Sequence, residues 1–288
     1  MTIDISTVPK PTNGRVLDET SDAIDEVNVL KGKTTASWKA DSEFDSEKDK
    51  TKFRQYENAC DRVKAFYKEQ HEKQTVAFNL KAREEFKKKT RARMSVWQAI
   101  ELLNTLVDDS DPDTSVSQIE HLLQTAEAIR RDGKPEWMQV TGLVHDLGKL
   151  LFFFGSEGQW DVVGDTFVVG CAFSEKNIYP ETFQATLRIG QRHAFVGHDE
   201  YLYHVCKDQS TLPEEGLAMI RYHSFYPWHR EEAYMYLANE KDVKTLEAVR
   251  AFNPYDLYSK SDSPCDAAAL RPYYENLIAK YFPPEVNW

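Results

Sequence analysis

Four histidines occupy positions at which the apolar face of a predicted helix would otherwise continue, and such positions suit metal ligands. They are His121, His145, His198 and His223. One histidine of this kind is more often structural, but four of them together with aspartates have the composition of a two-metal site in a helical protein. Nitrogen and oxygen donors without a thiolate suit iron, manganese, cobalt or zinc, and ligand type alone does not select among these metals.

His145 is followed directly by Asp146 in an apolar stretch, residues 137–154, that we expect to form one buried helix. A buried carboxylate without a partner is costly, so a metal ion close to Asp146 is the expected compensation. Adjacent helical residues diverge by about 100° around the axis, so the two side chains chelate one ion poorly but can serve two neighbouring ions, with the carboxylate bridging them. Lys149, one turn after His145, aims an ammonium group at the same volume.

Two glycines, Gly142 and Gly148, flank this pair at a cost in helix propensity, which predicts that another backbone or a ligand comes close there. For an isolated histidine and aspartate, the alternative is a buried hydrogen-bonded pair without metal, and the other histidines weaken that alternative. Asp199 follows His198 and could either orient it or be solvated. The other histidines are expected at the surface or behind the ligands: His71, His193, His204 and His229.

The surrounding pattern is typical of a mostly α-helical domain in which crossing helices enclose a polar centre. Ser95 with Gln98 predicts the start of a helix that reaches residue 107 and ends in a loop with four aspartates, residues 108–113. Four carboxylates at a helix end are more than a turn requires. Further helices are expected over residues 53–86, 117–131, 197–206, 212–226, 242–252 and 270–281, with an extended run at 160–166 and a loop with short helices over 168–192.

Composition narrows the classes of protein to consider. The formal net charge of −11 makes broad contact with a nucleic-acid backbone unlikely to be the function. No apolar run approaches the ~20 residues that span a bilayer. Four scattered cysteines without a C-x-x-C pair indicate a reduced, cytoplasmic setting, and we expect a monomer. The polar residues 1–50 predict a flexible arm, followed by a single catalytic domain over residues 51–288.

Short motifs between residues 51 and 288 resemble, in order, those of the myo-inositol oxygenases. The histidine–aspartate pair alone is a weak signal because the whole HD-domain superfamily shares it. G-H-D-E-Y (197–201) and R-Y-H-S-F-Y-P-W-H (221–229) are highly specific. The stretch between Gly170 and Gly197 is shorter than is usual in that family. The other motifs are F-R-Q-Y (53–56), V-D-D-S-D-P-D (107–113), H-L-L-Q-T-A-E (121–127), H-D-L-G-K (145–149), V-V-G-D-T-F (162–167), F-N-P-Y-D-L-Y-S-K (252–260) and R-P-Y-Y (271–274).

The resemblance implies an HD-type helical bundle around a mixed-valent Fe(II)/Fe(III) pair. Such an enzyme opens the ring of myo-inositol with O2 to give D-glucuronate, a four-electron oxidation with the substrate chelated to one iron. The resemblance implies that Asp146 bridges two ions, the first held by His121, His145 and Asp256 and the second by His198 and His223. It also implies a catalytic Lys149 and a set of substrate contacts: Arg54, Tyr67, Asp108, Asp111, Lys149, Gly164, Asp165, Ser224 and Lys260.

Two other enzyme classes would use much the same metals. An HD-type phosphohydrolase would attack phosphorus with a metal-bound hydroxide, and a related di-iron oxygenase would act on another substrate such as an organophosphonate. Both favour a basic pocket, whereas Asp108, Asp111 and Asp165 would repel a phosphate. A helical protein that binds metal only for stability, without enzymatic activity, gives no role to Lys149 and Lys260. The mixture of acidic and basic residues therefore favours a neutral polyol.

Overall fold

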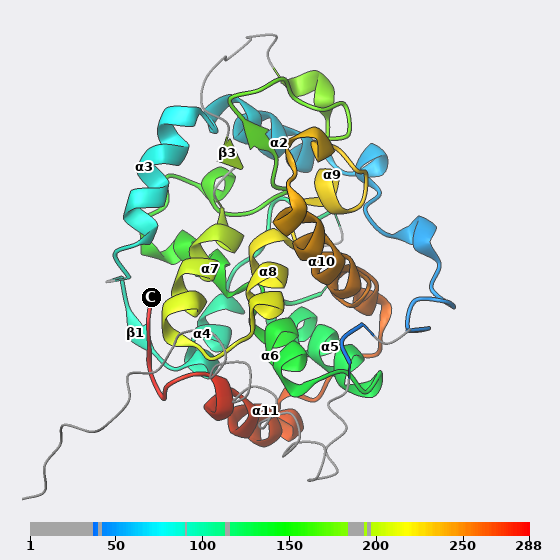
Figure 1. Cartoon of the computed structure of the whole chain (residues 1–288), viewed down its shortest axis with the longest axis vertical. Helices are drawn as coiled ribbons and strands as arrows, with labels where there is room; N and C mark the ends of the chain where they lie inside the picture. Colours follow the sequence, from blue (N-terminus) through cyan, green and yellow to red (C-terminus); the bar gives the residue numbers. More distant parts are fainter. Residues whose placement is uncertain (1–36, 40–41, 90, 113–115, 184–192, 195–196) are drawn as a thin grey trace, which may run out of the picture. The chain divides into compact units, whose positions relative to one another are not determined.

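α-Helices form most of the regular structure in the computed structural model, which describes residues 37–39, 42–89, 91–112, 116–183, 193–194 and 197–288 (Figure 1). The prediction of a mostly α-helical fold is confirmed. Among the described residues, no helix is long and apolar enough to cross a bilayer. The helices are α2 (Asp61–Lys73), α3 (Val76–Phe86), α4 (Val96–Leu103), α5 (Gln118–Arg131), α6 (Glu136–Val144), α7 (His198–Gln209), α8 (Glu214–Tyr222), α9 (Tyr226–His229), α10 (Glu240–Tyr258) and α11 (Ala267–Tyr281).

Shorter elements connect these helices. Two pairs of two-residue strands are antiparallel, β1 (Arg93–Met94) with β4 (Val286–Asn287) and β2 (Val168–Val169) with β3 (His193–Ala194). The expected extended run over residues 160–166 is wrong, because Gln159–Asp161 form a 3-10 helix and Val162 has φ −118° and ψ −57°, which are not strand angles. The carbonyl of Val162 accepts hydrogen bonds from His198. The 3-10 helices are η1 (Lys50–Lys52), η2 (Tyr56–Asn58), η3 (Leu147–Phe154), η4 (Gln159–Asp161), η5 (Pro180–Thr182), η6 (Met235–Leu237) and η7 (Ser259–Ser261).

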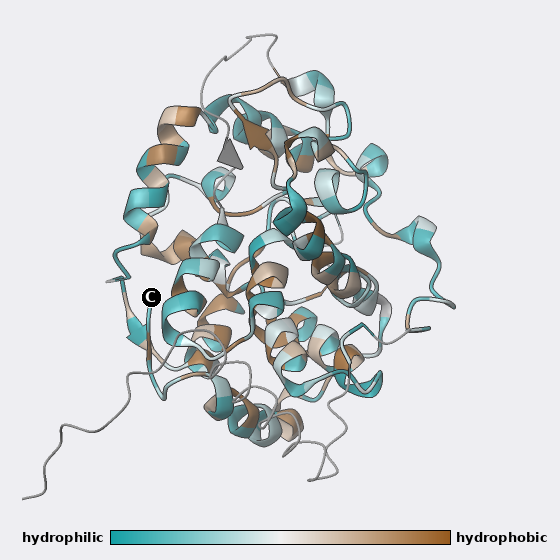
Figure 2. Ribbon diagram, viewed as in Figure 1, coloured by the Kyte–Doolittle hydropathy of each residue, from teal (hydrophilic) through white to brown (hydrophobic). Residues whose placement is uncertain are grey.

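Close helix packing places the ligand-bearing elements against one another. α5 and α6 lie side by side (Figure 1), and a Cβ on Gly142 would come within 2.7 Å of Ile129 Cδ1, as the glycine predicted. Figure 2 shows hydrophobic and hydrophilic residues mixed along α3 and α10. α3 buries one face, with Asn79, Ala82 and Phe86, whereas α10 is buried on all sides over residues 255–258. Ser95 and Gln98 form the predicted capping box at the start of α4. The apolar faces of these helices thus pack around a centre that is occupied by polar side chains.

The predicted single helix over residues 137–154 is wrong at its middle. α6 ends at Val144, and the chain turns at Asp146 before continuing as the 3-10 helix η3. His145 and Asp146 both keep helical backbone angles, so the break changes the path of the chain after Asp146 and leaves their two side chains diverging, as predicted. η3 then leads from the core to the surface. Its first residues are buried, whereas Phe152 and Phe153 are 38% and 37% exposed.

α10 is longer than the sequence predicted, because it continues through Pro254 to Tyr258. A proline inside a helix removes one backbone hydrogen bond, which is why the pattern predicted an end at residue 252. Asp256 therefore lies on the last turn of a helix rather than in a loop. α8 ends at Tyr222, and Pro227 lies in the first turn of α9, where proline is tolerated.

Residues just before the predicted domain start also contact the helices. The ring of Phe44 stacks on Tyr255 at 5.1 Å, and Ser42 Oγ lies 3.1 Å from the hydroxyl of Tyr255. Most of the predicted arm, residues 1–36 and 40–41, lies outside the described residues, so the boundary at residue 50 stays a prediction.

Removal of residues 1–37 is expected to leave turnover within about twofold of the full chain, because residues from Trp38 onward form their own compact unit. Phe44→Ala is the contrasting variant, and it should lower the free energy of unfolding by about 2 kcal/mol through loss of the aromatic contact. Steady-state kinetics and denaturant titration measure both effects. A folded but inactive truncation would assign the removed segment a functional role.

Candidate metal centre

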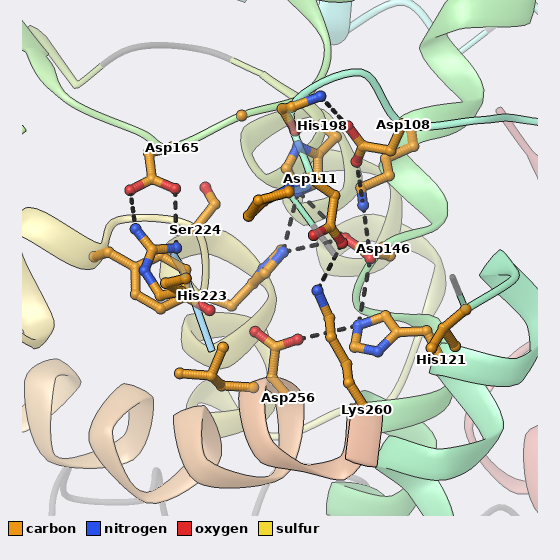
Figure 3. A pocket seen from close by; sticks show the side chains of 18 of the residues that line it. Asp108, Asp111, His121, Asp146, Asp165, His198, His223, Ser224, Asp256 and Lys260 are labelled. Atoms are coloured by element: carbon orange, nitrogen blue, oxygen red, sulfur yellow. Dashed lines mark hydrogen bonds and ion pairs between the residues drawn. The ribbon is translucent and has the colours of Figure 1, made fainter. Parts of the chain in front are cut away.

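Six side chains from five segments of the chain converge on one buried volume in two groups. In the first group, Asp256 Oδ1 lies 3.1 Å from His121 Nε2 and 3.2 Å from His145 Nε2. In the second, His198 Nε2 lies 3.0 Å from His223 Nε2. Asp146 lies between the groups, with Oδ2 at 3.6 Å from His145 Nε2. Its Oδ1 lies 3.4 Å from Nε2 of both His198 and His223 (Figure 3).

These separations fit metal coordination. An ion with bonds of about 2.1 Å holds its ligand atoms about 3.0 Å apart at right angles and about 3.4 Å apart at the tetrahedral angle. The structure brings together all six residues that the sequence proposed as ligands. Because each oxygen of Asp146 faces a different group, the arrangement has room for two ions that share this carboxylate.

Backbone carbonyls fix the orientation of three of the four histidines. Nδ1 of His145 lies 2.8 Å from Gly142 O, Nδ1 of His198 lies 2.8 Å from Val162 O, and Nδ1 of His223 lies 2.9 Å from Ile220 O. A carbonyl only accepts, so each Nδ1 donates its hydrogen, and each ring in its neutral form presents a lone pair at Nε2. Two such lone pairs 3.0 Å apart, on His198 and His223, repel each other, so this contact needs either a proton on one ring or a metal ion between the two. Together with the neighbouring oxygens of Asp146, the pairing is a reason to expect a metal.

The carboxylates of the centre are held in their ionised form. Burial raises the pKa of Asp146, but Lys149 and His145 outweigh burial and lower it well below its usual value. Burial likewise raises the pKa of Asp256, and the neighbouring His145 and His121 lower it well below the ordinary range. Ionised carboxylates are the form that binds metal.

A pocket opens next to the ligands and contains three further acidic residues, each paired with a cation. Lys149 Nζ lies 2.9 Å from Asp108 Oδ2 and also 2.9 Å from Asp146 Oδ2. Lys260 Nζ donates to Asp111 Oδ2 at 2.7 Å. Arg54 and Asp165 form the third pair. All of these residues line the pocket together with His121, His198, His223 and Asp256.

Arg54 forms the third pair, a two-point contact with Asp165 at 2.6 and 3.2 Å. Its guanidinium carbon lies 3.4 Å from the ring centroid of Tyr226 and 5.1 Å from that of Tyr56, so Arg54 makes two cation–π contacts. Arg54 has a φ of 57°, an unusual backbone conformation that these contacts must hold in place. Sequence reasoning missed Tyr226 and Tyr56 as pocket residues, although both lie within the quoted motifs and an aromatic next to an arginine is a usable signal.

The charges of the described pocket residues do not cancel. Five carboxylates and three cationic side chains line the pocket, so the carboxylates outnumber the cationic side chains by two. Arg54 pairs with Asp165 and Lys260 with Asp111, whereas Lys149 is shared between Asp108 and Asp146. The surplus negative charge therefore lies on Asp108, Asp146 and Asp256, and metal cations would balance it where Asp146 and Asp256 face the histidines.

The other predicted substrate contacts also line the pocket. Tyr67 is buried, and its hydroxyl lies 3.2 Å from that of Tyr56. Gly164 has a φ of 94°, and a Cβ there would come within 2.6 Å of Gln70 Nε2, so glycine is required on both counts. Ser224 lines the wall beside the second group of ligands.

The remaining histidines lie outside the ligand groups, and two of them are deeply buried. His71 stacks on Phe183 at 3.7 Å, and burial lowers the pKa of His71 to about 3. Nε2 of His229 donates to the backbone oxygen of His223 at 2.9 Å, which supports a ligand from behind. His204 is partly exposed and lies near Glu200. The side chain of His193 lies outside the described residues.

Gly148→Ala is expected to displace a ligand, because a Cβ at this position would lie 1.8 Å from the backbone oxygen of His198. The variant should lose about 3 kcal/mol of unfolding free energy and part of its metal, since α7 must move away. Gly216→Ala is the matched control, because its nearest neighbour is the side-chain oxygen of Thr141 at 2.9 Å, which can shift. Metal analysis and thermal unfolding measure the difference, and full metal content in Gly148→Ala would contradict the expected displacement.

Comparison with known proteins gives one consistent result. A family model described as myo-inositol oxygenase matches residues 60–194 and 192–288. The chain is 44% identical over 270 residues to an inositol oxygenase of Dictyostelium discoideum, which covers 85% of this chain and 92% of the relative. It is 47% identical over 261 residues to a probable inositol oxygenase of Oryza sativa subsp. japonica (82% and 85% covered). An inositol oxygenase of Danio rerio is 43% identical over 265 residues (84% and 95% covered).

Proposed function

Because the chain belongs to the myo-inositol oxygenase family, we infer that it is an inositol oxygenase, a metal-dependent enzyme that oxidises inositol. The observation that carries the inference is the pair of ligand groups sharing Asp146 beside a pocket of paired charges. We propose that the reaction is ring cleavage of myo-inositol with O2 to D-glucuronate, a four-electron oxidation that consumes no external reductant.

The proposed cofactor is a mixed-valent iron pair. His121, His145 and Asp256 would hold one iron, His198 and His223 the other, and Asp146 both. When bound, the pair supplies the activation of O2 and of the coordinated substrate. Imidazole and carboxylate ligands without thiolate suit iron. The substrate would chelate the iron next to His198 and His223, on the pocket side of the centre.

Lys149 is the residue that we propose to assist the chemistry from the protein side. Burial lowers its pKa, but Asp108 and Asp146 outweigh burial and raise it, so the group keeps its positive charge. The ammonium lies 2.9 Å from Asp146 Oδ2, the carboxylate that would be shared by the two irons, so it would lie close to a substrate hydroxyl bound at the metal centre. Its charge favours loss of the proton from that hydroxyl.

The pocket suits a neutral polyol better than a phosphate ester. Asp108, Asp111 and Asp165 accept hydrogen bonds from hydroxyl groups and repel phosphate oxygens. Each of the three is already paired with a cation, so the pocket outside the ligand groups offers balanced charge rather than a surplus of positive charge. Binding of a neutral ring therefore leaves no charge uncompensated, whereas a phosphate adds two.

The direct test is to load the protein with iron under anaerobic conditions, add myo-inositol, and then admit O2. We expect D-glucuronate in proportion to the O2 consumed, together with a paramagnetic signal from the mixed-valent pair. A parallel assay with phosphate monoesters and an organophosphonate tests the two alternative functions. Turnover of either of these, without glucuronate from myo-inositol, would overturn the proposal. Action as a monomer in the cytoplasm stays a prediction from the sequence.

A further inference from the structure

Asp199 is a buried carboxylate with an unusual set of partners, all of them neutral. Its side chain is 2% exposed. Oδ2 lies 2.7 Å from Ser224 Oγ and 3.0 Å from Thr166 Oγ1, and Oδ1 accepts from the backbone nitrogen of Glu200 at 2.8 Å. The two hydroxyl oxygens are themselves 2.8 Å apart. Asp199 Oδ2 therefore forms a triangle with the hydroxyl oxygens of Ser224 and Thr166, in which each oxygen is within hydrogen-bond distance of the other two.

Proton counting fixes the direction of the hydrogen bonds in this triangle. Two hydroxyls supply two hydrogens, and a carboxylate only accepts. If the hydrogen of Ser224 pointed into the pocket, its oxygen and Asp199 Oδ2 would face each other at 2.7 Å without a hydrogen between them. A short contact to a charged acceptor is among the stronger hydrogen bonds, so the hydrogen of Ser224 stays within the triangle.

Ser224 is the member of this triangle that lines the substrate pocket (Figure 3). With its hydrogen used internally, it can offer the pocket only a lone pair. We propose that Asp199 is a positioning residue that makes Ser224 an obligatory hydrogen-bond acceptor, so that the substrate must present a hydroxyl hydrogen at this point of the ring. The inference rests on the proposed function and adds a rule of specificity to it.

Asp199→Asn reverses this polarity without changing the shape of the side chain. The backbone nitrogen of Glu200 needs an acceptor, so the amide oxygen takes the place of Oδ1 and the amide NH2 group faces the two hydroxyls. The amide then donates to the hydroxyl oxygens. Thr166 is 2% exposed, so its hydrogen, no longer accepted by Asp199, goes to Ser224 Oγ at 2.8 Å, and the hydrogen of Ser224 is released toward the pocket. A carbonyl in the substrate would now be accepted where the wild type requires a hydroxyl.

The experiment measures binding to the iron-loaded, anaerobic enzyme by calorimetry. The ligands are myo-inositol and its keto analogues, in each of which one hydroxyl is replaced by a carbonyl. For one analogue, Asp199→Asn should improve binding relative to myo-inositol by about tenfold, the size of one hydrogen bond. The gain should vanish in the double variant Asp199→Asn with Ser224→Ala. Iron content and the unfolding midpoint of each variant separate positioning from a general structural effect.

Ser224→Ala alone gives a second test that does not depend on the folding of the Asp199 variant. It should lower the preference of the enzyme for myo-inositol over the same analogue by about tenfold, because the repelling lone pair is gone. If the affinity for the analogue relative to myo-inositol does not change in either variant, the inference is overturned. It is also overturned if the improved binding of the analogue persists in the double variant. Failure of the wild type to bind myo-inositol would instead contradict the proposed function.

Discussion

Asp146→Ala is expected to abolish the metal centre. The variant should bind one iron or none in place of two, and turnover should fall below about one-thousandth of the wild-type value. The reason is that Oδ1 and Oδ2 of Asp146 face different ligand groups, at 3.4 Å from His198 Nε2 and 3.6 Å from His145 Nε2. Iron content is measured by metal analysis. Addition of iron should raise the unfolding temperature of the wild type more than that of the variant.

Asp165→Ala is the matched control for this experiment. Asp165 is a buried aspartate of the same pocket, but its partner is Arg54 rather than a ligand histidine. This control should keep both irons and lose affinity for the substrate. Two irons retained in Asp146→Ala would contradict the bridging role.

Lys149→Met is expected to keep both irons while lowering kcat by about a hundredfold, the typical effect of losing one preorganised charge at a reacting centre. Methionine keeps most of the length of the side chain and removes its charge. The ammonium of Lys149 contacts Asp146 Oδ2 and Asp108 Oδ2 and lines the pocket, so its loss removes a positive charge beside the reacting hydroxyl while all six ligand side chains stay in place. Steady-state kinetics and metal analysis separate these two effects.

Lys260→Met gives the comparison, since Lys260 pairs with Asp111 in the same pocket. This second variant should raise KM more than it lowers kcat, because we place Lys260 among the substrate contacts and not at the reacting oxygen. Unchanged turnover in Lys149→Met would remove Lys149 from the chemistry.

The ligand set was accessible from the sequence because its members carry their own signal. His121, His145, His198 and His223 each interrupt an apolar face, and the buried carboxylate of Asp146 demands a cation. Gly148 was informative for the same reason, since a glycine inside an apolar stretch indicates close approach of another backbone. A residue whose type does not fit its apolar surroundings can therefore be identified from the sequence alone.

The course of the backbone around the metal centre could not be predicted from single residues. The same apolar pattern fits an α-helix and a 3-10 helix over a few residues, so the break after Val144 was not predicted. Pro254 predicted a helix end that tertiary packing overrides, and Asp256 was therefore identified only through the family resemblance. The triangle of Asp199, Thr166 and Ser224 joins three distant segments, and no local pattern indicates it.

The most direct test of the account is a crystal structure of the iron-loaded enzyme with data collected at the iron absorption edge. We predict two anomalous peaks, one among His121, His145 and Asp256 and one beside His198 and His223, each about 2.1 Å from a different oxygen of Asp146. A single peak, or Asp146 turned away from both metals, would contradict the account.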